Sequence, residues 1–270
     1  MNQIEQRTFD HHETCMGTVF RFAGHTPLSE QDHTDALTEA CAFLHAADEV
    51  FSLYKPESPL SRLARGETKV ADLNPVVEDI WNACEAWSAE TDGWFNAFTP
   101  DRTFDPSGLV KTWAAAEAGR VLLAAGVTDF AINAGGDVWL ADGLTGERSW
   151  KVGISKPVTI ASPEAGILTV FDLFNSPMRA VATSGTAERG LHIWNPRTYE
   201  YAENELIQVT VIADDLIKAD IWATAAFAEG VDAVARLNRV PNLEALFVLR
   251  DGGLAGTDGL IDYFAKVEGD

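Results

Sequence analysis

The chain has 270 residues, of which 46% are hydrophobic and 23% are charged. These are the proportions of an ordinary soluble globular protein, and a chain of this length can bury a sizeable core. It carries 41 acidic against 20 basic residues, a formal net charge of −21. A field of that sign repels nucleic acid and anionic lipid, so we expect no nucleic-acid partner. Phosphate binding would call for a divalent cation, although an acidic surface can equally serve solubility alone.

Features of export and of membrane insertion are absent from the sequence. No apolar run approaches the ~20 residues of a membrane helix, and the first fifteen residues contain neither a basic nor an apolar leader region. Cys15, Cys41 and Cys84 lack CxxC spacing, and no apolar leader of a lipoprotein precedes Cys15. We therefore expect a cytoplasmic protein with reduced thiols and no membrane span, in which Cys41 and Cys84 lie on apolar helix faces.

The first half of the chain predicts one strand followed by helices. Residues Gly17–Ala23 alternate as a strand, with Thr18, Phe20 and Phe22 on one face. We predict three helices, which run from about Thr34 to Phe51, from the Asn74–Pro75 start to about Trp87, and from near Ser107 to a C-terminal Gly126.

The second half predicts consecutive strands and two further helices. The strands are Phe130–Asn133, Val138–Ala141, Trp150–Ile154, Leu168–Phe174, Ala180–Thr183 and Val209–Ala213. The helices are Lys218–Ala228 and Val231–Asn238, and Leu243–Leu249 with Leu254–Phe264 predict a closing hairpin around Asp251-Gly252-Gly253. No repeat or linker divides the sequence, so we predict a single domain over residues 1–270. Helices gathered early and strands later favour an α+β fold.

The common nucleotide-binding loops, GxxxxGK[ST] and GxGxxG, are absent. In the segment Asp105–Lys111, a helix start favours anions and Lys111 lies one turn inside. The ordinary alternative is that Asp105 or Ser107 caps the helix and Lys111 is solvated. Gly135–Gly136 allow positive φ and close approach to a ligand, or form only a tight hairpin.

Two further clusters carry oxygen or nitrogen donors. Asp220 and Thr224, four residues apart, share one helical face, and Mg²⁺ prefers such oxygen ligands. Alternatively, Asp220 is a first-turn residue favoured by the helix dipole and Thr224 has no special role. His192, the only histidine beyond residue 45, follows Thr183-Ser184-Gly185 in a turn-rich stretch, although a lone histidine is more often structural.

The order of these motifs resembles the ApbE family of FAD:protein FMN transferases. The motifs are Met16-Gly17-Thr18, FSLYKPESPLSRL, GWFNAF, DPSGLVK, NAGGD, WKVGI, ATSG, HIWNP and ADIWATAAF. The resemblance implies a single compact α+β domain related to the T-fold, with helices packed on a mixed or antiparallel sheet. It also implies Mg²⁺-dependent transfer of FMN from FAD to a threonine or serine hydroxyl of a target flavoprotein, through a phosphoester bond, with release of AMP. Some members instead hydrolyse FAD to FMN and AMP.

The resemblance assigns a role to twelve residues of this chain. FAD contacts or residues that line its site are Met16, Tyr54, Trp94, Phe95, Asn96, Asp105, Lys111 and Ile193. Magnesium ligands are the Gly108 carbonyl and the Asp220 and Thr224 side chains. His192 matches the family's characteristic histidine, and we expect it to accept or position the proton of the attacking hydroxyl.

The chain departs from the family pattern at four positions. Asn96 and Asn195 stand where aspartate is usual, Thr112 stands where glycine is usual, and Trp222 adds bulk to the ADIWAT helix. These departures motivate an alternative, a protein that binds FAD without catalysis. The retained Asp220, Thr224, Lys111 and His192 favour the enzyme.

Overall fold

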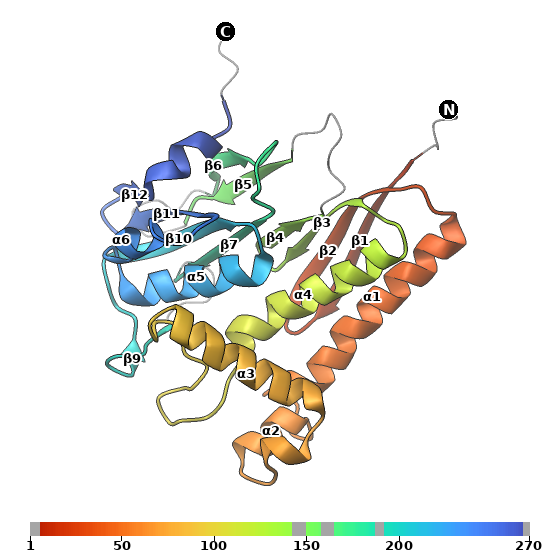
Figure 1. The fold of residues 1–270 in the computed structure, drawn as a ribbon, viewed down its shortest axis with the longest axis horizontal. Helices are drawn as coiled ribbons and strands as arrows, with labels where there is room; N and C mark the ends of the chain where they lie inside the picture. Colours follow the sequence, from red (N-terminus) through yellow and green to blue (C-terminus); the bar gives the residue numbers. More distant parts are fainter. Residues whose placement is uncertain (1–5, 142–149, 158–164, 187–191, 267–270) are drawn as a thin grey trace. The chain divides into compact units, whose positions relative to one another are not determined.

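The computed structural model describes residues 6–141, 150–157, 165–186 and 192–266 (Figure 1). The chain divides into two compact units, residues 1–146 and residues 147–270. Helices pack on antiparallel strands within each unit, which confirms the α+β class. The single domain over residues 1–270 stays a prediction. Within the described ranges, no helix is long and apolar enough to cross a membrane.

A run of four antiparallel strands lies at the centre of residues 1–146. In spatial order they are β1 (Arg7–Cys15), β2 (Thr18–Thr26), β3 (Asp129–Ala134) and β4 (Asp137–Leu140). Phe20 and Phe22 of β2 are fully buried, as the alternation predicts. Strand β1 escaped prediction because its sequence, RTFDHHETC, is polar, and only every second side chain from Phe9 onward is partly covered.

The helices of this unit begin and end at recognisable signals. They are α1 (Glu30–Phe51), α2 (Pro59–Ala64), α3 (Pro75–Glu90) and α4 (Ser107–Ala124), with a short 3₁₀ helix η1 (Val70–Asp72). Helix α1 starts four residues before the predicted Thr34, because the Ser29 hydroxyl accepts a hydrogen bond from the Asp32 N–H. The Asn74 start of α3 is confirmed, and so is the end of α4 before Gly126, whose φ is 96°. Helix α2 was not predicted.

Small residues in α4 allow a close approach to the strands. Ala114, Ala115 and Ala118 have no exposed surface. A Cβ added to Gly119 would lie 1.9 Å from Cζ3 of Trp139 on β4, so the indole packs directly on the helix backbone. Figure 1 shows α4 beside α1, and the two helices are in contact.

A second set of antiparallel strands lies within residues 147–270. In spatial order its main strands are β7 (Ala180–Gly185), β10 (Leu206–Ala213), β11 (Leu243–Leu249) and β12 (Leu254–Gly256). Two separate pairs are β5 (Lys151–Ser155) with β6 (Ile167–Asp172), and β8 (Trp194–Asn195) with β9 (Glu200–Tyr201). The helices are α5 (Leu216–Glu229), α6 (Ala233–Leu237) and the 3₁₀ helix η2 (Asp258–Tyr263).

Helix α5 packs on β7 and β10, and most of its side chains are buried. The six predicted strands of the second half are found with bounds shifted by at most three residues. The predicted closing hairpin is correct for β11 and the turn, and wrong beyond Gly256. There the buried Thr257 accepts a hydrogen bond from the Ala245 N–H at 2.9 Å, and the chain leaves the strand for the 3₁₀ helix.

Candidate functional site

Two tight turns meet within residues 1–146. Met16 and Gly17 join β1 to β2, with φ values of 50° and 69°, and Gly135 and Gly136 join β3 to β4, with φ of 62° and 106°. A Cβ on Gly135 would lie 2.3 Å from Oγ1 of Thr18, so the second turn lies directly against β2. The hairpin interpretation of the glycine pair is therefore confirmed, and the turn also brings NAGGD close to the Met16 segment.

Lys111 on α4 forms an ion pair with Asp137, the first residue of β4, through Nζ and Oδ2. The Asp137 side chain is 3% exposed and that of Lys111 is 18% exposed. The alternative in which Lys111 is simply solvated is therefore wrong. Asp137 was not among our predicted site residues, because its partner lies 26 positions away in the sequence. The only sequence signal was a charged residue directly after two glycines.

The GWFNAF and DPSGLVK segments come together at the start of α4. A Cβ on Gly108 would lie 3.3 Å from Cε2 of Phe95, and the Asp105 N–H donates to the Ala97 carbonyl at 2.7 Å. The Asp105 carboxylate accepts a hydrogen bond from the Ser107 N–H at 3.0 Å, although the residue at the cap position of α4 is Pro106 and not Asp105 or Ser107. Lys111 lies one turn further along the same helix.

The remaining predicted FAD contacts of this unit differ in exposure. Phe95 is buried, Trp94 is half-buried and Tyr54 is 97% exposed. Asn96 accepts a hydrogen bond from the Phe98 N–H at 2.9 Å, a local turn that aspartate could make equally well. Thr112 is fully buried and donates to the Leu109 carbonyl at 3.2 Å, so its hydroxyl is held within the helix.

A buried thiol lies near this helix start. Burial, and after it the negative charge of Asp105, raises the pKa of the Cys84 thiol to about 12. Cys84 is therefore protonated and unreactive at neutral pH. The predicted core positions of Cys41 and Cys84 are confirmed, and all three cysteines are free thiols.

Within residues 147–270, α5 presents a group of oxygen donors. Asp220 is 4% exposed, and Thr224, one turn later, has Oγ1 3.1 Å from Oγ of Ser184 on β7. Helix α5 begins at Leu216, with Asp215 as its cap, so Asp220 lies beyond the first turn. The helix-dipole alternative for Asp220 is therefore wrong. Ser184 was weighed only as part of a turn motif, and its contact with α5 was not predicted.

The HIWNP segment adjoins the same helix. Strand β8, which begins two residues after His192, contacts α5. His192 is exposed, while Ile193 is buried and its carbonyl accepts a hydrogen bond from the Ala202 N–H at 2.8 Å. Trp194 stacks on Tyr201 with ring centroids 4.1 Å apart, which fixes the small hairpin. His192 therefore lies directly before the small hairpin formed by β8 and β9.

Trp222 of α5, a departure from the family pattern, is 2% exposed and lies in the interior of this unit. Its indole N–H is buried and has no hydrogen-bond partner among the residues that the structure describes. The bulk that we expected from Trp222 is therefore accommodated in the core of this unit.

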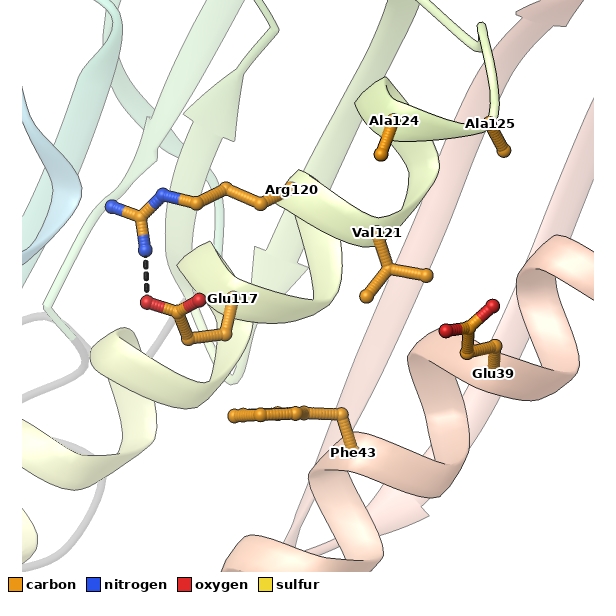
Figure 2. Close-up of a pocket in the computed structure, with 7 residues that line it drawn as sticks. All are labelled: Glu39, Phe43, Glu117, Arg120, Val121, Ala124 and Ala125. Carbon is orange, nitrogen blue, oxygen red and sulfur yellow. Dashed lines mark hydrogen bonds and ion pairs between the residues drawn. The ribbon is translucent and has the colours of Figure 1, made fainter. Parts of the chain in front are cut away.

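A hollow of about 460 Å³ lies between α1 and α4 (Figure 2). Figure 2 shows Phe43 and Val121 in its wall, with Glu117 and Arg120 forming an ion pair at its edge. None of the predicted site residues lines this hollow. Two of its charged groups, Glu117 and Arg120, pair with each other, and the hollow does not revise the site.

The family model of the ApbE family matches residues 98–247, more than half of the chain. The chain belongs to the ApbE family. It is 36% identical over 129 residues to an FAD:protein FMN transferase of Klebsiella pneumoniae, a match that covers 44% of this chain and 37% of that protein. It is 26% identical over 162 residues to the FAD:protein FMN transferase of Escherichia coli, covering 57% and 44%. The matches thus span less than half of the length of these curated relatives.

Solved structures share the fold. The ApbE protein of Thermotoga maritima superposes with a TM-score of 0.79 at 19% identity, over 96% of this chain and the whole of that one. The flavin transferase ApbE of Vibrio cholerae gives a TM-score of 0.78 at 16% identity, with the same coverage. These likenesses confirm that the predicted ApbE fold is correct.

Proposed function

We propose that this chain transfers FMN from FAD to a threonine or serine hydroxyl of an acceptor flavoprotein, with Mg²⁺ and with release of AMP. Membership of the ApbE family supports the flavin substrate. The observation that carries the proposal is the group formed by Asp220, Thr224 and Ser184, since it retains the expected metal ligands and adds a third oxygen donor.

The donors on α5 and β7 fit magnesium better than a softer ion. Asp220 offers a carboxylate, Thr224 and Ser184 offer hydroxyls, and none of the three offers sulfur or nitrogen. Mg²⁺ takes oxygen ligands and usually keeps water or substrate phosphate in the remaining positions. Asp220 and Thr224 would hold the ion. When bound, Mg²⁺ supplies charge neutralisation and orientation at the pyrophosphate.

The chain's own side chains supply the remaining roles. Lys111 would hold a phosphate oxygen, and its pairing with Asp137 fixes where the ammonium lies. Met16, Tyr54, Trp94, Phe95, Asn96, Asp105 and Ile193 would contact or surround FAD. His192 would accept the proton of the acceptor hydroxyl. The hydroxyl oxygen then forms the bond to the FMN phosphorus while the bond from that phosphorus to the bridging oxygen breaks, and AMP leaves with that oxygen.

The test uses the purified full chain with FAD, Mg²⁺ and an acceptor domain that carries a candidate serine or threonine, followed by intact mass measurement of the acceptor. We expect a mass gain of one FMN phosphoester, which chelator and Asp220→Ala each abolish. Asp232→Ala is the matched control, since Asp232 is an exposed carboxylate of the same unit and makes no side-chain capping bond. His192→Ala is expected to bind FAD normally and to lose most of the transfer.

Two outcomes would replace the proposal. Free FMN and AMP with an unmodified acceptor, across several acceptors, would make the protein an FAD pyrophosphatase. Tight FAD binding that chelator does not change, with intact FAD after long incubation, would make it a binding protein. Near-normal transfer in His192→Ala would show that His192 is not the proton acceptor and would leave the rest of the proposal intact.

A further inference from the structure

One face of the β1–α1 pair gathers nitrogen, sulfur and carboxylate donors. Nε2 of His11 lies 3.4 Å from Sγ of Cys41 and 3.6 Å from Oε2 of Glu13. One ligand atom from each of these residues lies within 4.8 Å of the other two. His45 adjoins them, with Nε2 2.9 Å from Oε1 of Glu13 and Nδ1 3.6 Å from Sγ of Cys15.

The side-chain repeats of strand β1 and helix α1 explain why these donor atoms lie together. Successive side chains of a strand point to opposite faces, so His11 and Glu13 of β1 share a face while His12 points away. Cys41 and His45 are four residues apart and share a face of α1. The burial pattern of β1 agrees, because His11 and Glu13 are half-buried and His12 is exposed.

The spacing of the donor atoms suits a tetrahedral ion. Usual zinc bonds of about 2.0–2.3 Å, at tetrahedral angles, place two ligand atoms about 3.3–3.8 Å apart. The two separations from His11 Nε2, 3.4 Å and 3.6 Å, lie in this range. The third separation, between Cys41 and Glu13, is within 4.8 Å.

We propose that His11, Glu13 and Cys41 form a site for a thiophilic divalent ion of the Zn²⁺ class. Imidazole, thiolate and carboxylate form a donor set that selects zinc over magnesium. It contains the sulfur and nitrogen that the Asp220, Thr224 and Ser184 group lacks. Water completes the coordination, because the His11 and His45 side chains are 38% and 53% exposed and leave the site open to solvent.

His45 is a positioning residue for this site. Its hydrogen bond to Oε1 of Glu13 orients the carboxylate and leaves Oε2, the oxygen nearer His11, for the ion. Such outer partners typically contribute about 10–100-fold to metal affinity. The ion would fasten β1, a strand at the end of the strand order, to the longest helix of its unit.

The experiment titrates Co²⁺ into tag-free, chelator-treated full-length protein and records absorption. We expect one Co²⁺ per chain with a thiolate-to-cobalt charge-transfer band, displaced by Zn²⁺ and unchanged by excess Mg²⁺. Cys41→Ser removes the band, and His11→Gln and Glu13→Gln each weaken binding at least tenfold. His45→Gln weakens binding about 10–100-fold and keeps the band.

Two controls isolate the site. His12→Gln changes the neighbouring histidine on the opposite face, and Cys84→Ala removes a buried thiol of the same unit, so both should bind Co²⁺ like the wild type. Circular dichroism melting checks that every variant is folded, and Glu13→Gln, a nearly isosteric change at a half-buried position, decides the matter if Cys41→Ser does not fold. The proposal is overturned if wild-type protein gives no charge-transfer band, if the band survives in Cys41→Ser, or if His12→Gln weakens binding as much as His11→Gln.

Discussion

Helices α4 and α5 each hold two predicted site residues and each contact a strand of their own unit through one of them. On α4, the ammonium of Lys111 pairs with the buried carboxylate of Asp137 on β4. On α5, the hydroxyl of Thr224 meets that of Ser184 on β7, one turn after the buried Asp220. The same design, a helix residue bound to a strand residue, thus carries a fixed cation in one unit and oxygen donors in the other.

The two contacts differ in how they could neutralise the charge of a phosphate. The Lys111 ammonium is held in place by the protein's own carboxylate, so it can contribute to binding without any metal. The Asp220 carboxylate, in contrast, repels phosphate unless a cation lies between them. The α4 contact is therefore expected to govern stability and FAD affinity, and the α5 contact to govern the metal requirement.

Breaking the α4 contact is expected to have the largest effect on stability. Asp137→Asn keeps the shape of the side chain and leaves the Lys111 ammonium without its carboxylate. Removal of one partner from a buried pair costs about 3–5 kcal/mol, and about 2–3 kcal/mol is expected here because Lys111 is partly exposed. Urea unfolding measures the loss.

The control is an exposed ion pair on the same helix. Glu117→Gln removes the partner of Arg120, whose side chain is 53% exposed, so less than about 1 kcal/mol should be lost. Equal losses in Asp137→Asn and Glu117→Gln would show that burial of the Lys111 pair does not matter.

The loss of stability at alkaline pH is a second test, and it concerns residues 1–146, because all three cysteines lie there. Burial raises the pKa of the Cys84 thiol from 9.0 to about 12. Above about pH 9 the unfolded thiol loses its proton while the folded one keeps it, so stability falls as the pH rises toward 12. One such thiol costs up to about 1.4 kcal/mol per pH unit.

The measurement compares urea unfolding of wild type and Cys84→Ala at about pH 8 and about pH 10. The wild type should lose about 1 kcal/mol more than the variant over this interval. Equal losses in the two proteins would mean that Cys84 does not report the alkaline transition. Reference to the variant removes the contribution of every other group, including the remaining thiols.

Local signals explain what the sequence predicted well. Asn74 before Pro75 and the glycine at 126 act through their nearest neighbours, and the structure confirms both helix ends. The buried faces of β2 and α5 follow from alternation and from an apolar run, which are also local patterns.

Contacts between distant residues explain what was missed. Asp137 meets Lys111 across 26 positions, Ser184 meets Thr224 across 40, and His11 meets Cys41 across 30. Strand β1 has a polar sequence and becomes recognisable only through its pairing with β2. Helix and strand propensities and hydrophobic periodicity do not predict these pairings, since the pairings depend on which elements become neighbours in the fold.

The smallest expected effect, and the sharpest test of the α5 contact, comes from Ser184→Ala. Loss of one hydroxyl contact costs about 1 kcal/mol of stability. If Ser184 supports the metal ligands, the Mg²⁺ concentration for half-maximal FAD turnover should rise about fivefold, the same free energy expressed as a dissociation constant. Turnover at saturating Mg²⁺ should change little, because Asp220 and Thr224 remain.

Thr183→Ala is the matched control for this variant. Thr183 is the adjacent residue on β7, and its Oγ1 lies 2.9 Å from Oγ1 of Thr210 on β10, so it loses a similar hydroxyl contact on the opposite face of the strand. Thr183 is exposed whereas Ser184 is buried, so Thr183→Ala should lose no more stability than Ser184→Ala, and only Ser184→Ala should shift the Mg²⁺ dependence. A shift in both would assign the effect to a general loosening of β7, whereas a shift in neither would make the Ser184–Thr224 contact purely structural.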